Sequence, residues 1–147
     1  MHRRNIIMGA FTAAGALVAA ATRGRANAAD TDKPKVVYHL CDLDKVAFVL
    51  GNIRNHFEGM GGPDKVTIEL VVHGPALKAF HAASANTDVA RRVGEFSKAG
   101  LAAQACGNSM KTQNVTLKDL LPGFGIADRG GVVRIAELQA LGYAYLK

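Results

Sequence analysis

Tryptophan is absent from the sequence, and aromatic residues make up only 6% of its 147 residues. No run rich in lysine or arginine occurs after residue 28 either. Proteins that bind nucleic acids usually carry a basic patch, often with aromatic side chains on which bases stack. The sequence therefore predicts no nucleic-acid partner.

A glycine-rich phosphate-binding loop is also missing. The two glycine clusters, GMGGPD (59–64) and PGFGIADRGG (122–131), match neither GxGxxG nor GxxxxGK(S/T), and neither occupies the required strand-to-helix turn. No internal repeat or low-complexity segment follows residue 28. We therefore predict no nucleotide cofactor and no repeat architecture.

Residues 1–28 have the layout of an export signal. A basic start at 2–4 precedes an apolar stretch at 6–21, and Ala-Asn-Ala at 26–28 offers a cleavage site. The pair Arg3-Arg4 resembles a twin-arginine (Tat) signal. The alternative is a transmembrane anchor, which the length barely permits because a span needs about 20 apolar residues. We expect cleavage, a periplasmic location and no membrane association of the mature protein.

Cleavage changes the charge and defines the domain. The signal holds four arginines and no acidic residue, so the formal charge falls from +6 to +2. The remaining residues, 29–147, suit one domain with a single core. Only two cysteines, Cys41 and Cys106, are present, and an even count in an oxidising compartment makes a disulfide the default expectation. A domain of this size does not need one for its stability.

Short apolar runs alternate with segments of helical periodicity over the rest of the chain. This alternation predicts a three-layer α/β domain with a mainly parallel sheet. The expected strands are residues 35–40, 66–72, 101–106, 124–128 and 143–147, and the expected helices are 44–62, 86–100, 117–121 and 131–142. Asp42 or Asp44 can cap the first of these helices, and Asn86 or Thr87 the second.

The first three strands end in residues that carry chemistry. Cys41 follows the first strand, His73-Gly74 follows the second, and Cys106-Gly107 closes the third. In open α/β sheets, ligands bind beyond the carboxyl ends of the strands. We therefore expect these residues to lie on one rim of the sheet, which favours a functional role for Cys106.

The turn AQACGNSM (103–110) supports two interpretations of Cys106. Backbone N–H groups at the turn that follows a strand, and a nearby imidazolium, favour the reactive thiolate. Gly107 leaves the sulfur uncrowded, and Asn108 and Ser109 add polar groups and a possible cap for a helix in the following segment. Alternatively, Cys106 is a small buried apolar side chain, since free cysteine is among the most buried residue types.

The remaining candidates are His73 and Cys41. His73 can titrate beside a substrate, or it can simply cap the segment that follows. Cys41 can resolve a mixed disulfide with Cys106, form a permanent bridge with it, or only pack. Together Cys41, His73 and Cys106 offer three metal ligands, but no CxxC or HxxxH spacing accompanies them, so we assign no metal site.

Taken in order, five stretches resemble the DsrE/DsrF-like family of small sulfur-relay proteins. They are KVVYHLCD, VLGNIRNHFE, IELVVHGPAL, the CGNSM turn and GVVRIAELQALGYAYLK, which together span residues 35–147. The resemblance implies an α/β/α fold with a five-stranded parallel sheet, and trimers or hexamers. It also implies that Cys106 carries sulfur as a persulfide, and it matches His73-Gly74, Asn52 and Asn55 to family positions.

The leading hypothesis is a periplasmic sulfur carrier or sulfurtransferase-like protein without a cofactor. Cys106 would hold sulfane sulfur, Cys41 would act as a resolving thiol or disulfide partner, and donor and acceptor would be thiol proteins or small sulfur compounds. The expected substrate-binding residues are His73, Gly74, Gly107, Asn108 and Ser109. The rival hypothesis is a non-catalytic oligomeric binding or scaffold module with structural or redox-paired cysteines.

Overall fold

A computed structural model describes residues 33–147; the predicted signal peptide lies outside the described residues. Its centre is a five-stranded sheet with the order β4-β3-β2-β1-β5, in which every neighbouring pair is parallel. This confirms the predicted fold class. The strands are β1 (Lys35–Leu40), β2 (Thr67–Val72), β3 (Ala102–Cys106), β4 (Phe124–Ala127) and β5 (Ala144–Leu146).

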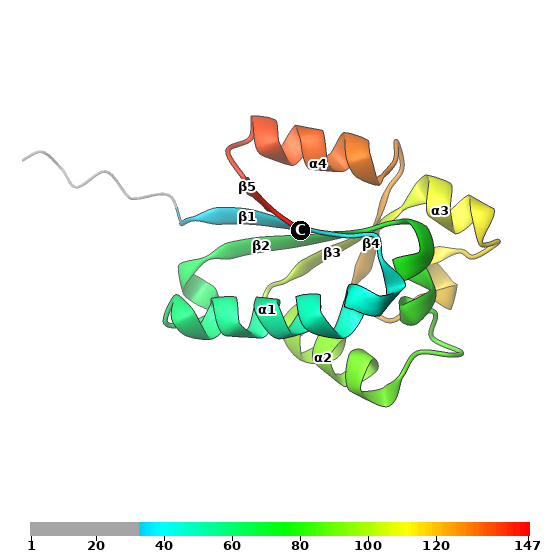
Figure 1. Ribbon diagram of the computed structural model, residues 1–147, viewed down its shortest axis with the longest axis horizontal. Coiled ribbons are helices and arrows are strands. Elements are labelled where there is room, and N and C mark those ends of the chain that lie inside the picture. The colour runs from blue at the N-terminus through cyan, green and yellow to red at the C-terminus, as the bar shows by residue number, and fades with distance from the viewer. Residues whose placement is uncertain (1–32) are drawn as a thin grey trace, which may run out of the picture. The chain divides into compact units, whose positions relative to one another are not determined.

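Helices cover both faces of this sheet (Figure 1). On one face lie α1 (Val46–Gly59) and α2 (Thr87–Lys98), and on the other lies α4 (Gly131–Ala140). The short helix α3 (Gly107–Thr112) follows β3 directly. Short 3₁₀ segments complete the chain: η1 (Leu43–Lys45), η2 (Pro63–Lys65), η3 (Gly74–Phe80) and η4 (Leu117–Asp119). The helix expected at 117–121 is thus only a 3₁₀ turn.

Alternation along the strands builds a core on each side of the sheet. The larger core lies under α1 and α2 and includes Leu40 and Val72, with α1 contributing the five apolar residues that its spacing predicts, Val46, Val49, Leu50, Ile53 and Phe57. The smaller core lies under α4, where Val37 and Val71 pack against Ile135 and Leu138. Side chains that lie an even number of residues from Val37 in β1, or from Val71 in β2, therefore face α4.

A buried ion pair fixes α4 to the centre of the sheet. The guanidinium of Arg134 donates from Nε to Glu69 Oε1 at 2.6 Å and from a terminal nitrogen to Oε2 at 2.8 Å. Glu69 lies in β2 and is only 4% exposed. A bidentate pair of this kind sets both the depth and the rotation of a helix, because its two hydrogen bonds have a fixed geometry.

Two predicted helix caps are wrong. Helix α3 begins at Gly107 with Cys106 as its N-cap residue, so Asn108 and Ser109 lie inside the first turn instead of capping it. Neither acid before α1 caps that helix: its N-cap residue is Lys45, because a 3₁₀ turn intervenes. The Asn86 cap of α2 is confirmed, since its side chain accepts from the Asp88 backbone N–H. Within residues 33–147, no helix is long and apolar enough to cross a bilayer.

Candidate functional site at the carboxyl rim of the sheet

The carboxyl ends of β1, β2 and β3 meet at one edge, as expected for parallel strands. Leu40 pairs with Val72, and Val72 pairs with Ala105. The residues that follow Leu40, Val72 and Ala105 are Cys41, His73 and Cys106, respectively. The register therefore places the three sequence-predicted positions in a row across neighbouring strands.

Cys106 sits between β3 and the starts of two helices. Its residue is 6% exposed. A Cβ added to Gly131, the first residue of α4, would lie 3.3 Å from the Cys106 Cβ and 3.2 Å from the His73 Cβ. The first turn of α4 is thus packed directly against Cys106, and only a residue without a side chain permits this approach.

Hydrogen bonds, rather than an apolar environment, surround the Cys106 sulfur. Burial is the largest single influence on this thiol and by itself raises its pKa. Backbone N–H groups of Ser109, Gly131 and Asn108, together with the Ser109 hydroxyl, donate to the sulfur and outweigh burial, so the pKa of Cys106 is lowered. A thiol held in this way favours the thiolate, which is the nucleophilic form.

Ser109 links the sulfur to the end of β2. Its Oγ accepts a hydrogen bond from the Gly74 backbone N–H at 2.7 Å, while its hydroxyl donates towards Cys106. The Gly74 carbonyl in turn accepts from Gln113 Nε2 at 2.8 Å. Because the Gly74 contact fixes the hydroxyl oxygen, the Ser109 proton is directed at the sulfur rather than at solvent.

Gly107 has a packing role. A Cβ at this position would lie 3.2 Å from the Ala127 carbonyl oxygen and 3.1 Å from that of Asp128. Glycine is thus required where α3 starts against the end of β4. Beside it, the Asn108 side chain packs on Gly130, whose φ of +108° favours glycine.

A surface hollow of about 790 Å³ lies beside this turn. Three of the predicted substrate-binding residues line it: Gly74, Asn108 and Ser109. Lys78 and His81 line it as well, and Lys78 gives it a positive charge. Asn52 and Asn55, the other family positions, lie in α1.

We expect iodoacetamide to alkylate Cys106 with a pH midpoint below the value of about 8.5 typical of free cysteine. The reason is that the donors around the sulfur lower the pKa of this thiol, so thiolate persists to lower pH. In Gly131→Ala, the new Cβ pushes α4 away from Cys106 and weakens one donor. Alkylation near neutrality should then slow about tenfold, which corresponds to the free energy that one hydrogen bond to a charged group contributes. The measurement is peptide-resolved alkylation in a Cys41→Ser background.

Gly94→Ala is the matched control for this variant. Gly94 lies in α2, and nothing lies within 4 Å of a Cβ added there. The control should keep the wild-type alkylation profile of Cys106. A Gly131→Ala protein with an unchanged profile would contradict the role of the α4 amide.

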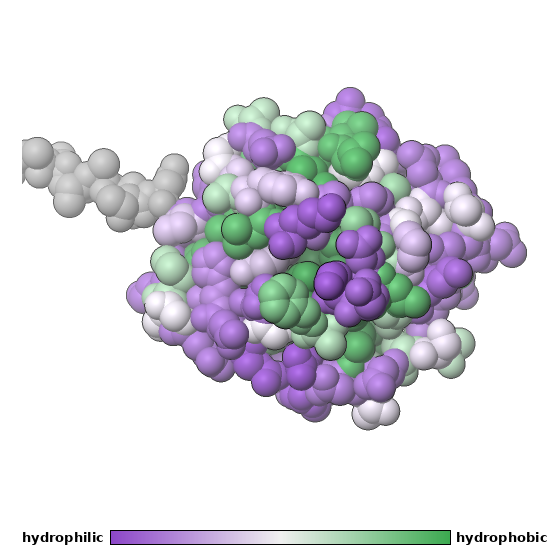
Figure 2. All heavy atoms as spheres, viewed as in Figure 1, coloured by the Kyte–Doolittle hydropathy of each residue, from purple (hydrophilic) through white to green (hydrophobic). Residues whose placement is uncertain are grey.

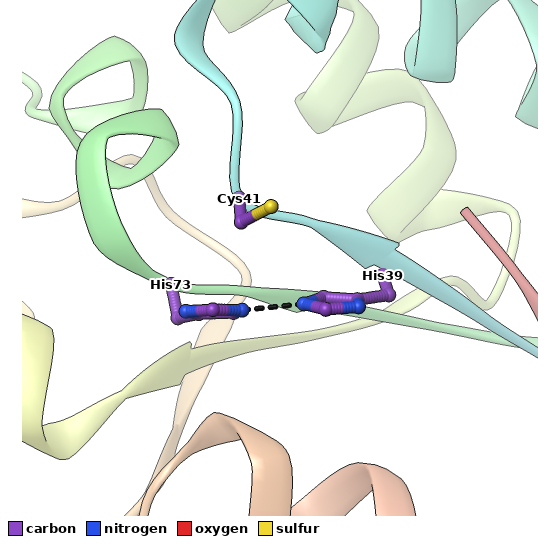
Figure 3. Close-up of side chains that lie close together, drawn as sticks. All are labelled: His39, Cys41 and His73. Atoms are coloured by element: carbon purple, nitrogen blue, oxygen red, sulfur yellow. Dashed lines mark hydrogen bonds between the residues drawn. The ribbon is translucent and has the colours of Figure 1, made fainter.

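A second cluster joins β1 to the end of β2, and it contains a residue that the sequence analysis did not select. His39, Cys41 and His73 place their ligand atoms within 4.8 Å of one another (Figure 3). The two imidazoles stack with an interplanar angle of 16°, and their Nε2 atoms are hydrogen-bonded. The three-ligand set considered from the sequence included Cys106; the structure groups Cys41 and His73 with His39 instead.

Burial sets the protonation of this cluster. It lowers the pKa of His39, assisted by the nearby charges of His73 and Lys147. The pKa of His73 is likewise lowered by burial. Burial also raises the pKa of Cys41, and the hydrogen bond from its thiol to Asp42 Oδ1 acts in the same direction. The cluster is therefore two neutral imidazoles beside a protonated thiol.

The partners of His73 and Cys41 narrow their roles. His73 makes no side-chain cap to the segment after β2, and its ring contacts His39. Cys41 and Cys106 are both free thiols in the structure. The close polar neighbours of Cys41 are thus the two histidines and Asp42, while those of Cys106 are backbone amides and a hydroxyl.

The chain matches no family model and no curated protein sequence, but its fold matches solved structures. MTH1491, a protein of unknown function from Methanobacterium thermoautotrophicum, superposes with a TM-score of 0.68 at 26% identity, over 77% of this chain and 97% of that one. BT1422, a conserved protein of unknown function from Bacteroides thetaiotaomicron, gives 0.55 at 17% identity, over 76% and 93%. YchN from E. coli gives 0.54 at 9% identity, over 76% and 96%. The chain therefore has a DsrE/YchN-like fold.

Proposed function

We propose that the protein is an exported sulfur carrier or sulfurtransferase-like protein of the DsrE/DsrF-like family, and that it holds sulfane sulfur as a persulfide on Cys106. One observation carries the proposal: the buried Cys106 lies at the ligand-binding rim of a parallel sheet as the N-cap residue of α3, with the first residue of α4 packed against it, and the surrounding amides and the Ser109 hydroxyl lower the pKa of its thiol. A cysteine that serves only as packing needs none of these donors.

Sulfur transfer at this site proceeds by two thiol exchanges. The Cys106 thiolate attacks the outer sulfur of a donor persulfide or of thiosulfate. The new S–S bond forms as the donor S–S bond breaks, and the leaving group is the donor thiolate or, from thiosulfate, sulfite. An acceptor thiolate then attacks the outer sulfur, takes it as a new persulfide and releases the Cys106 thiolate. Charge and electrons balance in each step, so no cofactor is needed.

The groups around Cys106 match the charge that each step produces. A persulfide anion and a departing thiolate are both stabilised by N–H donors, and the amides of Ser109 and Gly131 are already in place. The adjoining hollow brings Lys78 and His81 near the approach path, which favours a small anionic donor such as thiosulfate or a low-molecular-weight persulfide. The small exposed fraction of Cys106, 6%, favours the same size class.

Export and oligomerisation belong to the same proposal. Export rests on the signal-like layout of residues 1–28. A homo-oligomer, trimer or hexamer, follows from the family resemblance and is supported by apolar side chains over α1 and α4 (Figure 2). Phe48 of α1 and Val132 of α4 are 62% and 65% exposed. The two side chains belong to opposite faces of the sheet, so each would take part in a separate contact between subunits.

The proposal is tested by loading the purified chain with thiosulfate or glutathione persulfide and measuring its intact mass. We expect the gain of one sulfur atom per chain, removed by reductant and mapped to the peptide that contains Cys106. Cys41→Ser should load to the same extent, because Cys41 is not among the groups that contact the Cys106 sulfur.

The rival interpretation, a non-catalytic scaffold, predicts a different result. Its cysteines would stay unmodified by donor and unreactive to alkylating reagents, or would be fully oxidised to one another. Failure of both wild type and Cys41→Ser to take up sulfur, with an unreactive Cys106, would favour this rival.

A further inference from the structure

We propose that His39, Cys41 and His73 form a binding site for a divalent cation of borderline-soft character, with Zn²⁺ as the matching ion. None of the three ligands is among the groups that hydrogen-bond the Cys106 thiol, so the site can be tested independently of sulfur loading on Cys106; it gives His73 and Cys41 a different role from the substrate-binding and resolving roles expected from the sequence. It lies at the junction of β1 and β2, on the same rim as Cys106.

The two central strands fix the positions of the three ligands: His39 lies within β1, and Cys41 and His73 are the first residues after β1 and β2. His39 lies two residues after Val37 in β1, so its side chain points to the same face of the sheet, the face covered by α4. In β2 it pairs with Val71, and His73 follows Val71 by two residues. Cys41 comes directly after β1. A ligand within a strand, or directly at its end, is held more precisely than a ligand in a long loop, which favours a preformed site.

The ligand atoms surround a common point. Each atom lies within 4.8 Å of the other two, and in Figure 3 the two imidazole Nε2 atoms point at one another with the Cys41 sulfur beside them. A tetrahedral zinc ion holds its nitrogen and sulfur ligands about 3.3 to 3.6 Å apart. Small side-chain rotations, which open the contact between the two Nε2 atoms, reach these separations without moving the strands.

A second layer of hydrogen bonds orients the first ligand. His39 Nδ1 is bonded to the Tyr145 hydroxyl of β5 at 2.7 Å. When Nδ1–H donates to that hydroxyl, the lone pair of His39 lies on Nε2 and points into the cluster. Metal-bound histidines almost always use their other ring nitrogen in this way.

The donor set selects the class of ion. Two imidazole nitrogens and one thiolate suit Zn²⁺ far better than Mg²⁺ or Ca²⁺, which take oxygen ligands. Asp42, whose Oδ1 lies 3.4 Å from the Cys41 sulfur, offers a fourth ligand or a second-layer contact. The cluster also borders a hollow of about 330 Å³ lined by His39 and Cys41, which leaves room for water or a small ligand on the ion. Lys147 also lines the hollow, and Asp42 offsets its charge.

The test is titration of chelator-treated full-length chain with Zn²⁺ in competition with a chromophoric chelator, and with Co²⁺ as a spectroscopic probe. We expect one equivalent per chain and a near-ultraviolet thiolate-to-cobalt absorption band. Cys41→Ser and His73→Ala should each weaken Zn²⁺ binding by about 100-fold or more, and Tyr145→Phe by about tenfold. His81→Ala is the matched control, because His81 bonds Gln113 outside the cluster.

A measurement on the unaltered protein covers the case in which a variant fails to fold. Zn²⁺ should slow alkylation of Cys41 at least tenfold while leaving sulfur loading of Cys106 unchanged. Absence of stoichiometric binding, equal alkylation of Cys41 with and without Zn²⁺, or binding lost in Cys106→Ser but kept in Cys41→Ser would each overturn the proposal.

Discussion

Cys106→Ser is expected to abolish sulfur loading while leaving the protein folded. A serine oxygen does not form a stable bond to sulfane sulfur under these conditions, so the variant has no place to hold the transferred atom. The fold should persist because the added hydroxyl accepts the same N–H groups, from Ser109 and Gly131, that now donate to the thiol. Intact mass after incubation with a persulfide donor, together with far-ultraviolet circular dichroism, measures both parts.

Cys41→Ser separates this result from a general effect of losing a thiol. It should load like the wild type, since the Cys41 sulfur lies beside His39 and His73 and is not among the groups that act on the Cys106 thiol. A Cys106→Ser protein that still acquires sulfur on Cys41 would contradict the assignment of the carrier cysteine.

Arg134→Ala is expected to lower the free energy of unfolding by about 3 kcal/mol, the low end for removal of one partner from a buried ion pair. The substitution removes both charge-assisted hydrogen bonds of Glu69, a residue that is only 4% exposed when Arg134 is present. The same ion pair holds α4 against the sheet, so its loss should also move the backbone amide of Gly131, the first residue of α4, away from the Cys106 sulfur. Urea denaturation gives the first effect, and the alkylation profile of Cys106 gives the second.

Arg91→Ala is the matched surface control. Arg91 also pairs with two acids, Asp88 and Glu95, but all three side chains are about half exposed. Solvent screens such pairs, so the control should shift the urea midpoint little. An Arg134→Ala protein as stable as this control would show that the buried pair contributes nothing net.

The layers of this fold follow from periodicity in the sequence. The spacing of Val46, Val49 and Leu50 marks one helix face, and the β-branched run at 66–72 marks a strand buried on both sides. From parallel strands alone it follows that Cys41, His73 and Cys106 share one rim. The alternation of side chains along a strand also predicts which face of the sheet each residue occupies: His39, two residues after Val37, lies on the same face as Val37.

Contacts between distant segments do not follow from such patterns. Gly131 lies 25 positions after Cys106 in the sequence, and nothing in a Gly-Gly pair indicates that its amide reaches that sulfur. The pairing of His39 with His73 depends on strand order, which periodicity does not contain. The cap predicted for Asn108 or Ser109 was wrong because α3 starts at once after β3, which gives the Ser109 hydroxyl to the thiol instead.

The most direct test is the intact mass of the protein isolated from its own cells without reductant, before and after thiol alkylation. Sulfur carriage predicts a mass heavier by whole sulfur atoms, removed by reductant and mapped to the peptide of Cys106. A mass short by two hydrogens with no alkylation, which denotes a Cys41–Cys106 disulfide, would contradict it, as would two unmodified thiols that no donor can load.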